Sequence, residues 1–524
     1  MRFTSLIFLA FFLCVYILFW SGRRTRLPLL FVASFAFYAA WSIGFALHFM
    51  AVIVVSYSLI RIGHQRRRTL YGESSAIYEG RKDDRDGPGG GEGGGRPYWL
   101  WSVLGLNFAN LFLFKYAGAA ALLFADLGLW RPGGGDAAAA LSAAWPGFAL
   151  VLPLAISFYT FQICAYAIDV SRGQIPEDPG FLRFAVFILF FPQLVAGPIM
   201  RYSEFFGQLE RLDRLEPRLP QMSAGVYLLI QGFAKKVLIA DNLSPATFAV
   251  LFAPEQYDWQ SNVAAVVGFA AQLYCDFSGY TDIARGLGKL LGLELPENFF
   301  APYLSSSFRV FWRNWHRTLT TWLRDYVYIP LGGSRLSGWR AALNTLIVLL
   351  LIGVWHGAGY NFFVLGLING LYLIGEGLVV GWLARFPRLV GSPIAPALGV
   401  VITLSFVCVA MVMMVTPDFA TTLDVYRRVF GLDPARGAGS GGERFAGVSQ
   451  LWGGFALALF FNALQRLREF LTERAGRGDA ADWFFETRAR SYLSLGGLWL
   501  LGFLFLVLIG RFAPGSADFI YFQF

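Results

Sequence analysis

The sequence predicts an all-α, polytopic integral membrane protein, and three observations support that prediction. Of the 524 residues, 56% are hydrophobic and only 15% are charged, whereas soluble domains carry about 25% charged residues. Apolar stretches long enough for a helix to cross a membrane recur along the chain. The basic residues behind the formal net charge of +9 cluster in short loops, which indicates membrane topology rather than binding to nucleic acid. We expect about 10–13 transmembrane or re-entrant helices, because each span requires roughly 20 residues.

The N-terminal region, residues 1–78, is predicted to form transmembrane helices. Phe3–Trp20 is too long for the apolar part of a signal peptide, so we expect it to be a retained first helix. The apolar segments Leu27–Ile43 and Gly44–Ile60 separate two arginine-rich loops. The positive-inside rule makes both loops cytoplasmic and places the N-terminus outside. Residues 79–97 are charged and then rich in glycine, which is typical of a disordered cytoplasmic loop.

The rest of the single membrane domain, 1–524, is predicted to hold a core at 98–416, an extramembrane loop at 417–449, and C-terminal helices and a tail at 450–524. Its apolar segments are Tyr98–Phe114, Gly147–Ile168, Phe181–Val195, Val226–Ile239, Val263–Leu273, Leu343–Val354, Phe362–Leu383, Leu398–Val415, Leu451–Leu464 and Leu495–Ile509. Several are shorter than the roughly 20 residues of a full span. Short segments are tolerated at membrane depth only where protein shields them or where they line a cavity. We therefore expect an irregular, cavity-forming centre at about Phe191–Gly359.

Residues Arg309–Arg324 are predicted to form one continuous helix with three kinds of side chain in register. At 100° per residue, four arginines share an arc of about 80°, an aromatic row occupies the adjoining arc, and His316 lies between them. Such a helix suits a membrane interface, and it also suits an anionic ligand, since guanidinium groups bind phosphate in a bidentate fashion. The cationic row is Arg309, Arg313, Arg317 and Arg324, and the apolar row is Trp312, Trp315, Leu319 and Trp322.

His356, another of the four histidines, follows the apolar run Leu343–Trp355 and has glycines on both sides. Small residues at this place let neighbouring helices approach closely. An ionisable group near hydrocarbon depth is costly, so it is a candidate functional residue. The alternative is a structural histidine bonded to a backbone carbonyl, and its position alone does not separate the two.

Three further polar clusters fall in the predicted centre: Phe191–Tyr202, Gly232–Asn242 and Tyr274–Asp282. The first is punctuated by proline and glycine, the second contains a lysine pair, and the third contains two aspartates. Taken singly, each is best interpreted as an interfacial turn or a helix cap. Their concentration in one region is a stronger indication of function than any one of them.

Several common chemistries find no support in the sequence. There is no phosphate-loop motif, no zinc-protease motif, no nucleophile elbow, and no set of histidines or cysteines with metal-ligand spacing. The four cysteines are isolated in apolar segments, so neither a disulfide framework nor a metal site is expected.

In these blocks the chain resembles the membrane-bound O-acyltransferase (MBOAT) family, and within it the branch of alginate O-acetyltransferase membrane proteins. The matching residues are Phe191–Phe205, Gly232–Leu243, Tyr274–Ile283, Ser307–Gly333 and Gly353–Gly357, and the ending Phe519–Phe524 is also similar. The resemblance covers most of the chain from about Leu152 onward. It does not extend to the glycine-rich insertion near Gly87–Gly95 or to Pro417–Ser449. It implies the MBOAT fold, a ring of helices around a central funnel or tunnel.

The resemblance also implies an activity and a location. Similar proteins are multi-pass proteins of the bacterial inner membrane that take an acyl group from a cytoplasmic donor, which in this branch is acetyl-CoA. The acetyl group is then placed on an extracytoplasmic polysaccharide by a periplasmic or membrane-anchored SGNH-like partner. No bound cofactor or metal is implied beyond the donor, which is a substrate.

The family's near-invariant histidine falls on His356, and its more variable second histidine falls on His316. Transfer from a thioester to a hydroxyl needs a base near neutral pH, which suits histidine. We expect His356 to abstract the acceptor's proton or to accept the acyl group transiently, and His316 to orient the donor or polarise its carbonyl. Candidate substrate-binding residues are Arg309, Arg313, Arg317, Trp312, Trp355, Asp276, Asp282 and Asn361.

Two of these sets also have simpler interpretations. The arginines, which would attract the phosphates of CoA, equally fit anchors on the cytoplasmic side of the membrane. The aspartates, which would orient a histidine, equally fit helix caps.

Other functions remain open from the sequence. D-alanyl or another acyl transfer to a cell-envelope polymer lies within the same family. A secondary transporter or flippase would use intramembrane charges as an ion path, although the chain shows no internal repeat. A non-catalytic membrane scaffold would tolerate loss of both histidines.

Overall fold

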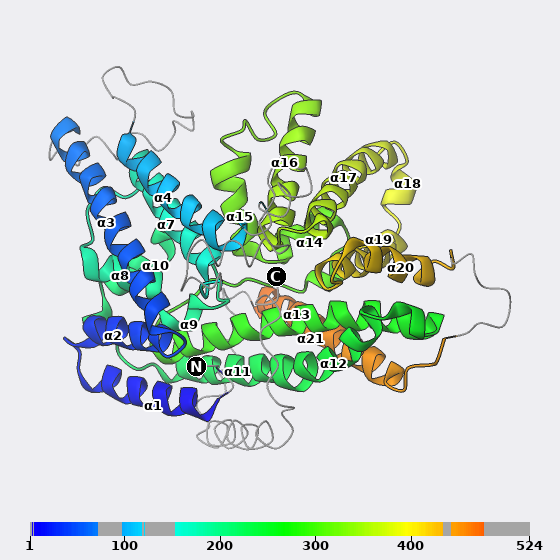
Figure 1. Ribbon diagram of the computed structural model, residues 1–524, viewed down its shortest axis with the longest axis horizontal. Coiled ribbons are helices and arrows are strands. Elements are labelled where there is room, and N and C mark those ends of the chain that lie inside the picture. The colour runs from blue at the N-terminus through cyan, green and yellow to red at the C-terminus, as the bar shows by residue number, and fades with distance from the viewer. Residues whose placement is uncertain are drawn as a thin grey trace, which may run out of the picture. The chain divides into compact units, whose positions relative to one another are not determined.

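The computed structural model describes residues 3, 5–71, 97–117, 120, 152–432 and 442–475 (Figure 1). Within them the secondary structure is helical, apart from an isolated parallel bridge between Tyr257 and Glu443. The predicted glycine-rich loop 79–97, the apolar segment Leu495–Ile509 and the ending Phe519–Phe524 lie outside the described residues, except for Pro97. The described residues fall into two compact units, and each is considered by itself. The divisions of the chain at 78, 97, 416 and 449 stay predictions.

The first unit comprises the described residues of Met1–Val195 and Ile199–Leu215. A buried aromatic core holds it together, in which the rings of Phe49 and Tyr159 stack with centroids 4.1 Å apart. Arg26 is also buried there, and its guanidinium donates to the carbonyl oxygens of Phe19, Leu212 and Leu215, which offsets its desolvation. The helices are α1 Leu6–Ser21, α2 Arg26–Ala39, α3 Ile43–Tyr71, α4 Tyr98–Lys115, α7 Ile156–Arg172, α8 Phe181–Leu189, α9 Phe191–Leu194, α10 Tyr202–Leu209 and the 3₁₀ turn η3 Leu212–Arg214.

The second unit comprises Ala196–Pro198 and the described residues of Glu216–Phe524, and it contains both candidate histidines. Its first helices are α11 Leu219–Phe233, the π-helix η4 Ala234–Ala240, α12 Asp241–Leu251, the 3₁₀ turn η5 Pro254–Gln256, α13 Trp259–Leu290 and the 3₁₀ turn η6 Pro302–Leu304. They are followed by α14 Phe308–Asn314, α15 Arg317–Leu323, the π-helix η7 Arg324–Tyr328, α16 Gly338–His356, α17 Tyr360–Leu383 and α18 Pro387–Val390. The last are α19 Ile394–Met411, the 3₁₀ turn η8 Val412–Met414, α20 Phe419–Val429 and α21 Val448–Ala475.

Helix α13 is the centre of the second unit. It is almost entirely buried, and α11, η4, α12 and α21 pack against it (Figure 1). Glycines permit the tight contact with α11: a Cβ built at Gly279 would lie 2.7 Å from the carbonyl oxygen of Gly232, and a Cβ at Gly232 would lie 2.6 Å from that of Gly279. Only small residues allow two helix backbones to come this close.

Two of the predicted interfacial turns are wrong. Gly232–Asn242 and Tyr274–Asp282 both lie inside continuous helical segments, the first across α11, η4 and α12 and the second in the middle of α13. Their charged residues do not need a membrane surface, because lysines of one helix neutralise aspartates of the other. The first predicted cluster does break the helix, since α9 is a short turn that is followed by residues without helical structure.

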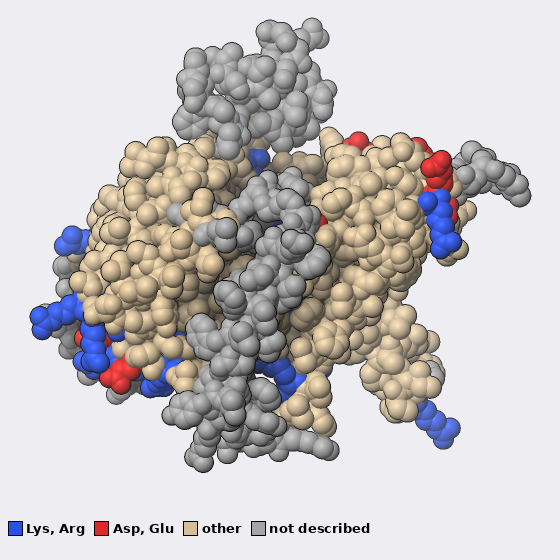
Figure 2. All heavy atoms as spheres, turned by 90° about the horizontal axis from the view of Figure 1, so that it is seen from below, with Lys and Arg blue, Asp and Glu red and all other residues tan. Residues whose placement is uncertain are grey.

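The surface and the helices confirm the predicted class of an all-α, polytopic membrane protein. Among the described residues, five helices are long and apolar enough to cross a membrane: Ile43–Arg66, Leu219–Leu251, Gly338–His356, Tyr360–Leu383 and Ile394–Met414. Shorter apolar helices occur at Ile7–Ser21 and Arg26–Ala39. On the face shown in Figure 2, charged side chains occupy only small parts of the described surface. Large apolar side chains such as Leu378 and Ile394 are more than two-thirds exposed, which suits contact with lipid.

Candidate functional site

The predicted continuous helix Arg309–Arg324 is wrong, because it is broken at Trp315 and His316. Helix α14 ends at Asn314, α15 begins at Arg317, and His316 between them adopts a left-handed backbone with φ 43° and ψ 54°. That conformation is uncommon for a residue with a side chain and usually reflects a constraint. The predicted alignment of four arginines along one helix face therefore does not form.

A preceding loop segment satisfies the backbone groups that this break releases. The backbone carbonyl oxygen of Asn298 accepts a hydrogen bond from the backbone N–H of Arg317 at 2.9 Å. The backbone N–H of Phe300 donates to the backbone carbonyl oxygen of Asn314 at 3.0 Å. The side-chain oxygen of Asn298 accepts the N–H of Thr318 at 3.2 Å. Because these three groups find partners, they do not add to the cost of the break.

The other end of α14 is fixed by two side chains. Ser307 caps the helix by accepting the N–H of Val310. Glu376, from α17, accepts the N–H groups of Phe308 and Arg309 at 2.6 and 3.1 Å. A carboxylate at a helix N-terminus is favoured by the helix dipole, so α14 has a defined position relative to α17.

His316 is buried, with 1% of its surface exposed, and aromatic rings surround it. Its ring packs edge-on against Phe277 of α13 at 4.7 Å between centroids and lies 5.8 Å from the ring of Trp355. Burial lowers the pKa of the His316 imidazole well below its usual range, and nearby His356 lowers it further. The side chain is therefore neutral at physiological pH.

His356 is the last residue of α16 and is brought close to His316 by the same tryptophan. The ring of Trp355 lies 4.8 Å from the ring of His356, so its indole contacts both histidines. Glycines on α16 and α17 let the two helices approach closely here: a Cβ at Gly366 would lie 2.7 Å from the backbone oxygen of Leu349, and one at Gly353 would clash with the backbone of Phe362. This packing fixes the end of the helix that carries His356.

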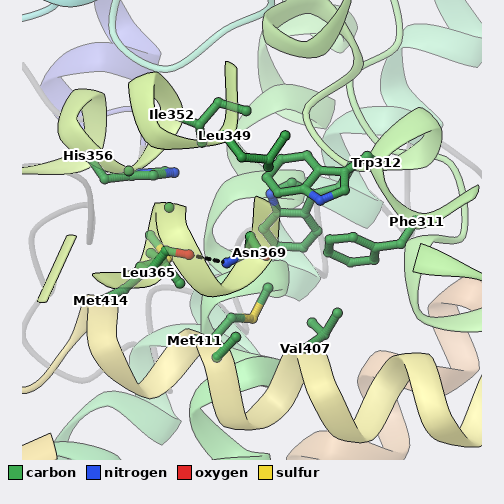
Figure 3. A pocket seen from close by; sticks show the side chains of 14 residues that line it. Phe311, Trp312, Leu349, Ile352, His356, Leu365, Asn369, Val407, Met411 and Met414 are labelled. Atoms are coloured by element: carbon green, nitrogen blue, oxygen red, sulfur yellow. Dashed lines mark hydrogen bonds between the residues drawn. The ribbon is translucent and has the colours of Figure 1, made fainter. Parts of the chain in front are cut away.

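A pocket opens beside His356 (Figure 3). Residues of α14, α16, α17, α19 and η8 line it together with Trp315. Most of them are apolar or aromatic, including Phe311, Trp312, Met411 and Met414. His356 and Asn369 are its polar lining residues, and the Asn369 amide already donates to the carbonyl of Leu365 at 2.7 Å. Figure 3 shows the nitrogen-bearing edge of the His356 imidazole directed toward the space between these helices. His356 is thus the titratable group in a largely apolar pocket.

The other predicted binding residues differ in their relation to this pocket. Trp312 lines it, whereas Trp355 contacts the histidines without being among the lining residues. Arg309, Arg313 and Arg317 are exposed, and Arg317 forms an ion pair with Glu297 at 3.2 Å. The side-chain amide of Asn361 donates to the carbonyl of Thr416 at 3.1 Å, which ties α17 to the end of η8.

The two aspartates lie in a separate cluster of buried charge, which we define as Lys235, Lys236, Asp241, Asp276 and Asp282. Asp282 pairs with Lys235 at 2.7 Å, and Lys236 bridges Asp241 at 2.7 Å and Asp276 at 2.6 Å. These ion pairs account for the burial of both aspartates without a role in orienting a histidine.

Sequence reasoning missed two residues that position this site, Asn298 and Glu376. Asn298 acts on the start of α15, which the sequence did not reveal as a helix end. Glu376 acts on the start of α14 from a helix that follows later in the chain. Glu376 carries one available signal, since it is a carboxylate inside an apolar helix. Asn298 is an ordinary loop residue by sequence and carries none.

Comparison with known proteins agrees with this architecture. The model of the membrane-bound O-acyltransferase family matches residues 170–416, which include both histidines and every pocket residue. The "Probable alginate O-acetylase AlgI" of Pseudomonas aeruginosa is 35% identical over 381 residues, covering 71% of this chain and 65% of that protein. The chain therefore aligns with just under two thirds of that relative.

Two further relatives differ in what their names describe. The "Peptidoglycan O-acetyltransferase" of Helicobacter pylori is 30% identical, covering 77% of this chain and 73% of that protein. The "Teichoic acid D-alanyltransferase" of Bacillus subtilis is 28% identical, covering 50% and 68% respectively. The chain belongs to the membrane-bound O-acyltransferase family, a family of multi-pass acyltransferases.

Proposed function

We propose that this protein transfers an acetyl group from acetyl-CoA, on the cytoplasmic side of a bacterial inner membrane, toward an extracytoplasmic polysaccharide. A periplasmic or membrane-anchored SGNH-like partner would complete the transfer to the sugar. The names of the first two relatives, which describe O-acetylation of alginate and of peptidoglycan, support this choice of group. The apolar lining of the pocket supports it as well, since the lining helices α16, α17 and α19 are long and apolar enough to cross a membrane.

The observation that carries the proposal is the position of His356 in a largely apolar pocket, one tryptophan away from a second buried histidine. An apolar pocket with one base excludes most water, which protects a thioester from hydrolysis. It also accommodates a short acyl group without polar partners. The pocket thus suits the transfer of an acetyl group better than the recognition of a sugar.

The proposed reaction moves one acyl group and one proton. The acceptor hydroxyl oxygen attacks the thioester carbonyl carbon, a C–O bond forms, and the C–S bond breaks. His356 accepts the hydroxyl proton and returns it to the departing thiolate, so the imidazole is regenerated. A positioned base of this kind contributes roughly 10²- to 10⁴-fold to rate. His316 orients the donor, and Trp312 contacts it within the pocket.

The exposed arginines would act outside the pocket. Arg309, Arg313 and Arg317 are available to attract the phosphates of CoA as it approaches. Because Arg317 is already paired with Glu297, its contribution requires exchange of one anionic partner for another. The alternative role of these arginines as anchors at the membrane surface predicts no effect on donor binding.

The test uses purified protein in nanodiscs, radiolabelled acetyl-CoA and a candidate acceptor, with thioester hydrolysis and label transfer measured together. We expect turnover in the wild type, its loss in His356→Ala and its reduction in His316→Ala. His48→Ala is a matched control, because His48 is bonded to Asn110 at 2.9 Å in the other unit. Turnover that survives in folded His356→Ala would contradict the proposal.

The second candidate is transfer of a D-alanyl or another acyl group, which the Bacillus subtilis relative favours. Mass spectrometry of the group transferred to the acceptor separates the two. A transporter remains a different class of function, and ion-coupled uptake by proteoliposomes without any acyl donor would support it. For a transporter, neither His356→Ala nor His316→Ala would change the rate of thioester hydrolysis.

A further inference from the structure

The side-chain oxygen of Asn298 is at the centre of the hydrogen bonds around His316. It lies 3.2 Å from Nδ1 of His316, 3.2 Å from the backbone nitrogen of Thr318 and 3.0 Å from the Thr318 hydroxyl. Asn298 and His316 are each 1% exposed, so water does not compete for these bonds. The same residue accepts the backbone N–H of Arg317 on its main-chain oxygen.

The contact with Thr318 determines which end of the Asn298 amide faces the histidine. A backbone N–H is always a donor, so the atom that it meets must be an acceptor. The amide oxygen of Asn298 therefore points toward Thr318 and His316, because the opposite orientation would place an NH₂ group against an N–H group. This assignment rests on the hydrogen-bond network alone.

The orientation of the amide in turn determines the proton on the imidazole. The oxygen of Asn298 cannot donate, so Nδ1 of His316 must carry the hydrogen in the bond between them. A neutral imidazole has one proton, and so Nε2 is the nitrogen with the lone pair.

We propose that Asn298 is a positioning residue for His316, fixing the direction of the ring and holding the imidazole in the Nδ1-protonated tautomer, so that the lone pair is on Nε2. This inference rests on the proposed acyl transfer, and it narrows the role of His316. A neutral imidazole with its proton on Nδ1 does not donate from Nε2, so it does not polarise the acyl carbonyl. At Nε2 this tautomer acts only as a hydrogen-bond acceptor.

The backbone geometry explains how Asn298 alone can fix both the direction and the tautomer of the His316 ring. The left-handed conformation of His316 sets the direction of its side chain, and Asn298 maintains that conformation by binding the first two N–H groups of α15. The same amide oxygen then meets the imidazole. Loss of Asn298 would therefore disturb both the direction of the ring and its tautomer.

The His316 ring has a neutral partner in Asn298, although charged groups lie on the neighbouring elements. His356 lies on α16, Asp276 and Asp282 lie on α13, and Glu297 precedes Asn298 in the chain. Both aspartates pair with lysines, and Glu297 pairs with Arg285 and Arg317. A neutral amide beside His316 keeps the imidazole neutral, which a carboxylate would not do.

The direct experiment is ¹⁵N nuclear magnetic resonance of the histidine side chains in full-length protein, which has only four histidines. The His316 signal is assigned by its absence in His316→Gln. We expect a proton on Nδ1 and none on Nε2 at neutral pH, and a mixture of tautomers in Asn298→Ala. A proton on Nε2 of the wild type would overturn the inference.

Kinetics provide an independent readout. We expect Asn298→Ala to lower kcat about 10- to 100-fold, by analogy with the loss of a partner that orients a metal-binding histidine. Asn344→Ala is the matched control, because Asn344 is also buried and bonds two loop carbonyls at 3.1 and 3.3 Å without contacting a histidine. We expect it to leave the pH profile of kcat unchanged.

Asn298→Asp tests whether the partner of His316 must be neutral, because the substitution keeps the acceptor oxygen and adds a negative charge. The added negative charge raises the pKa of His316, so the imidazolium persists to higher pH and activity falls at the acidic end. We expect the acidic limb of the kcat profile to move upward by about 1–3 pH units. An unchanged limb in this variant would contradict the positioning role.

These outcomes separate the inference from the proposed function. Absent acyl transfer together with an Nδ1-protonated His316 would leave the positioning role intact and reject the enzyme activity. Acyl transfer together with an Nε2-protonated His316 would support the enzyme activity and reject the positioning role.

Discussion

Two buried polar regions of the second unit differ in the surroundings of their polar groups. In the charge cluster of Lys235, Lys236, Asp241, Asp276 and Asp282, the lysines and aspartates form ion pairs between tightly packed helices. At the histidine site, the surrounding side chains are mostly apolar or aromatic, and a pocket adjoins them. Full pairing without space is typical of structure, whereas a titratable group beside space is typical of a site. On this comparison we propose a structural role for the cluster and a chemical role for the histidines.

The largest expected effect is at the histidine site. His356→Ala removes the proposed base, so we expect acyl transfer to fall about 10²- to 10⁴-fold. Thermal unfolding in the same nanodiscs should change little, because the substitution leaves no buried charge unpaired. Loss of folding rather than of turnover would assign His356 to structure and remove the contrast between the two regions.

The charge cluster should show the opposite behaviour. Lys235→Met leaves Asp282 buried and without its lysine, and we expect the free energy of unfolding to fall by about 3–5 kcal/mol. The double variant Lys235→Met with Asp282→Leu removes both charges and should regain most of that loss. Denaturation in detergent measures both variants. If the double variant stayed folded but lost turnover, the cluster would belong to the catalytic machinery.

A smaller effect is expected where α11 and α13 touch. Gly279→Val places a side chain against the backbone of Gly232, and overpacking of this kind costs about 1–3 kcal/mol. Gly453→Val on α21 is the control, because a Cβ there meets nothing within 4 Å. Equal stability of the two variants would show that the close approach of α11 and α13 is not needed for the cluster.

The smallest effect is expected at the surface. Arg317→Gln breaks an ion pair with a 44% exposed side chain, so stability should change by at most about 1 kcal/mol. If Arg317 attracts the donor, KM for acetyl-CoA rises while kcat holds. Arg324→Gln is the comparison, since Arg324 pairs with its neighbour Asp325. Identical KM values for both variants would favour membrane anchoring.

The sequence predicted an all-α membrane protein and the helices that are apolar along their length. These segments avoid water because of their composition alone. It also singled out His316 and His356 as candidates. It did not predict that α13 continues through Asp276 and Asp282, since the neutralising lysines come from a different helix. Pairing between helices is a tertiary effect that helical periodicity does not encode.

The break at His316 was unpredictable for a similar reason. The helical periodicity of Arg309–Arg324 favours one helix, but the loop residue Asn298 offers competing hydrogen bonds from 18 positions earlier in the chain. Glu376 acts likewise on the start of α14, from a helix that follows later. Asn298 is ordinary in the sequence, and Glu376 stands out only as a carboxylate inside an apolar helix. Both gain their roles from the fold.

The most direct test of the central claim is electron cryo-microscopy of the protein in nanodiscs with a non-hydrolysable thioether analogue of acetyl-CoA. The account predicts density for the acetyl-bearing end of the analogue in the pocket lined by Trp312, Met411 and Met414, within hydrogen-bonding reach of His356. Density for the acetyl end elsewhere, with this pocket empty, would contradict it.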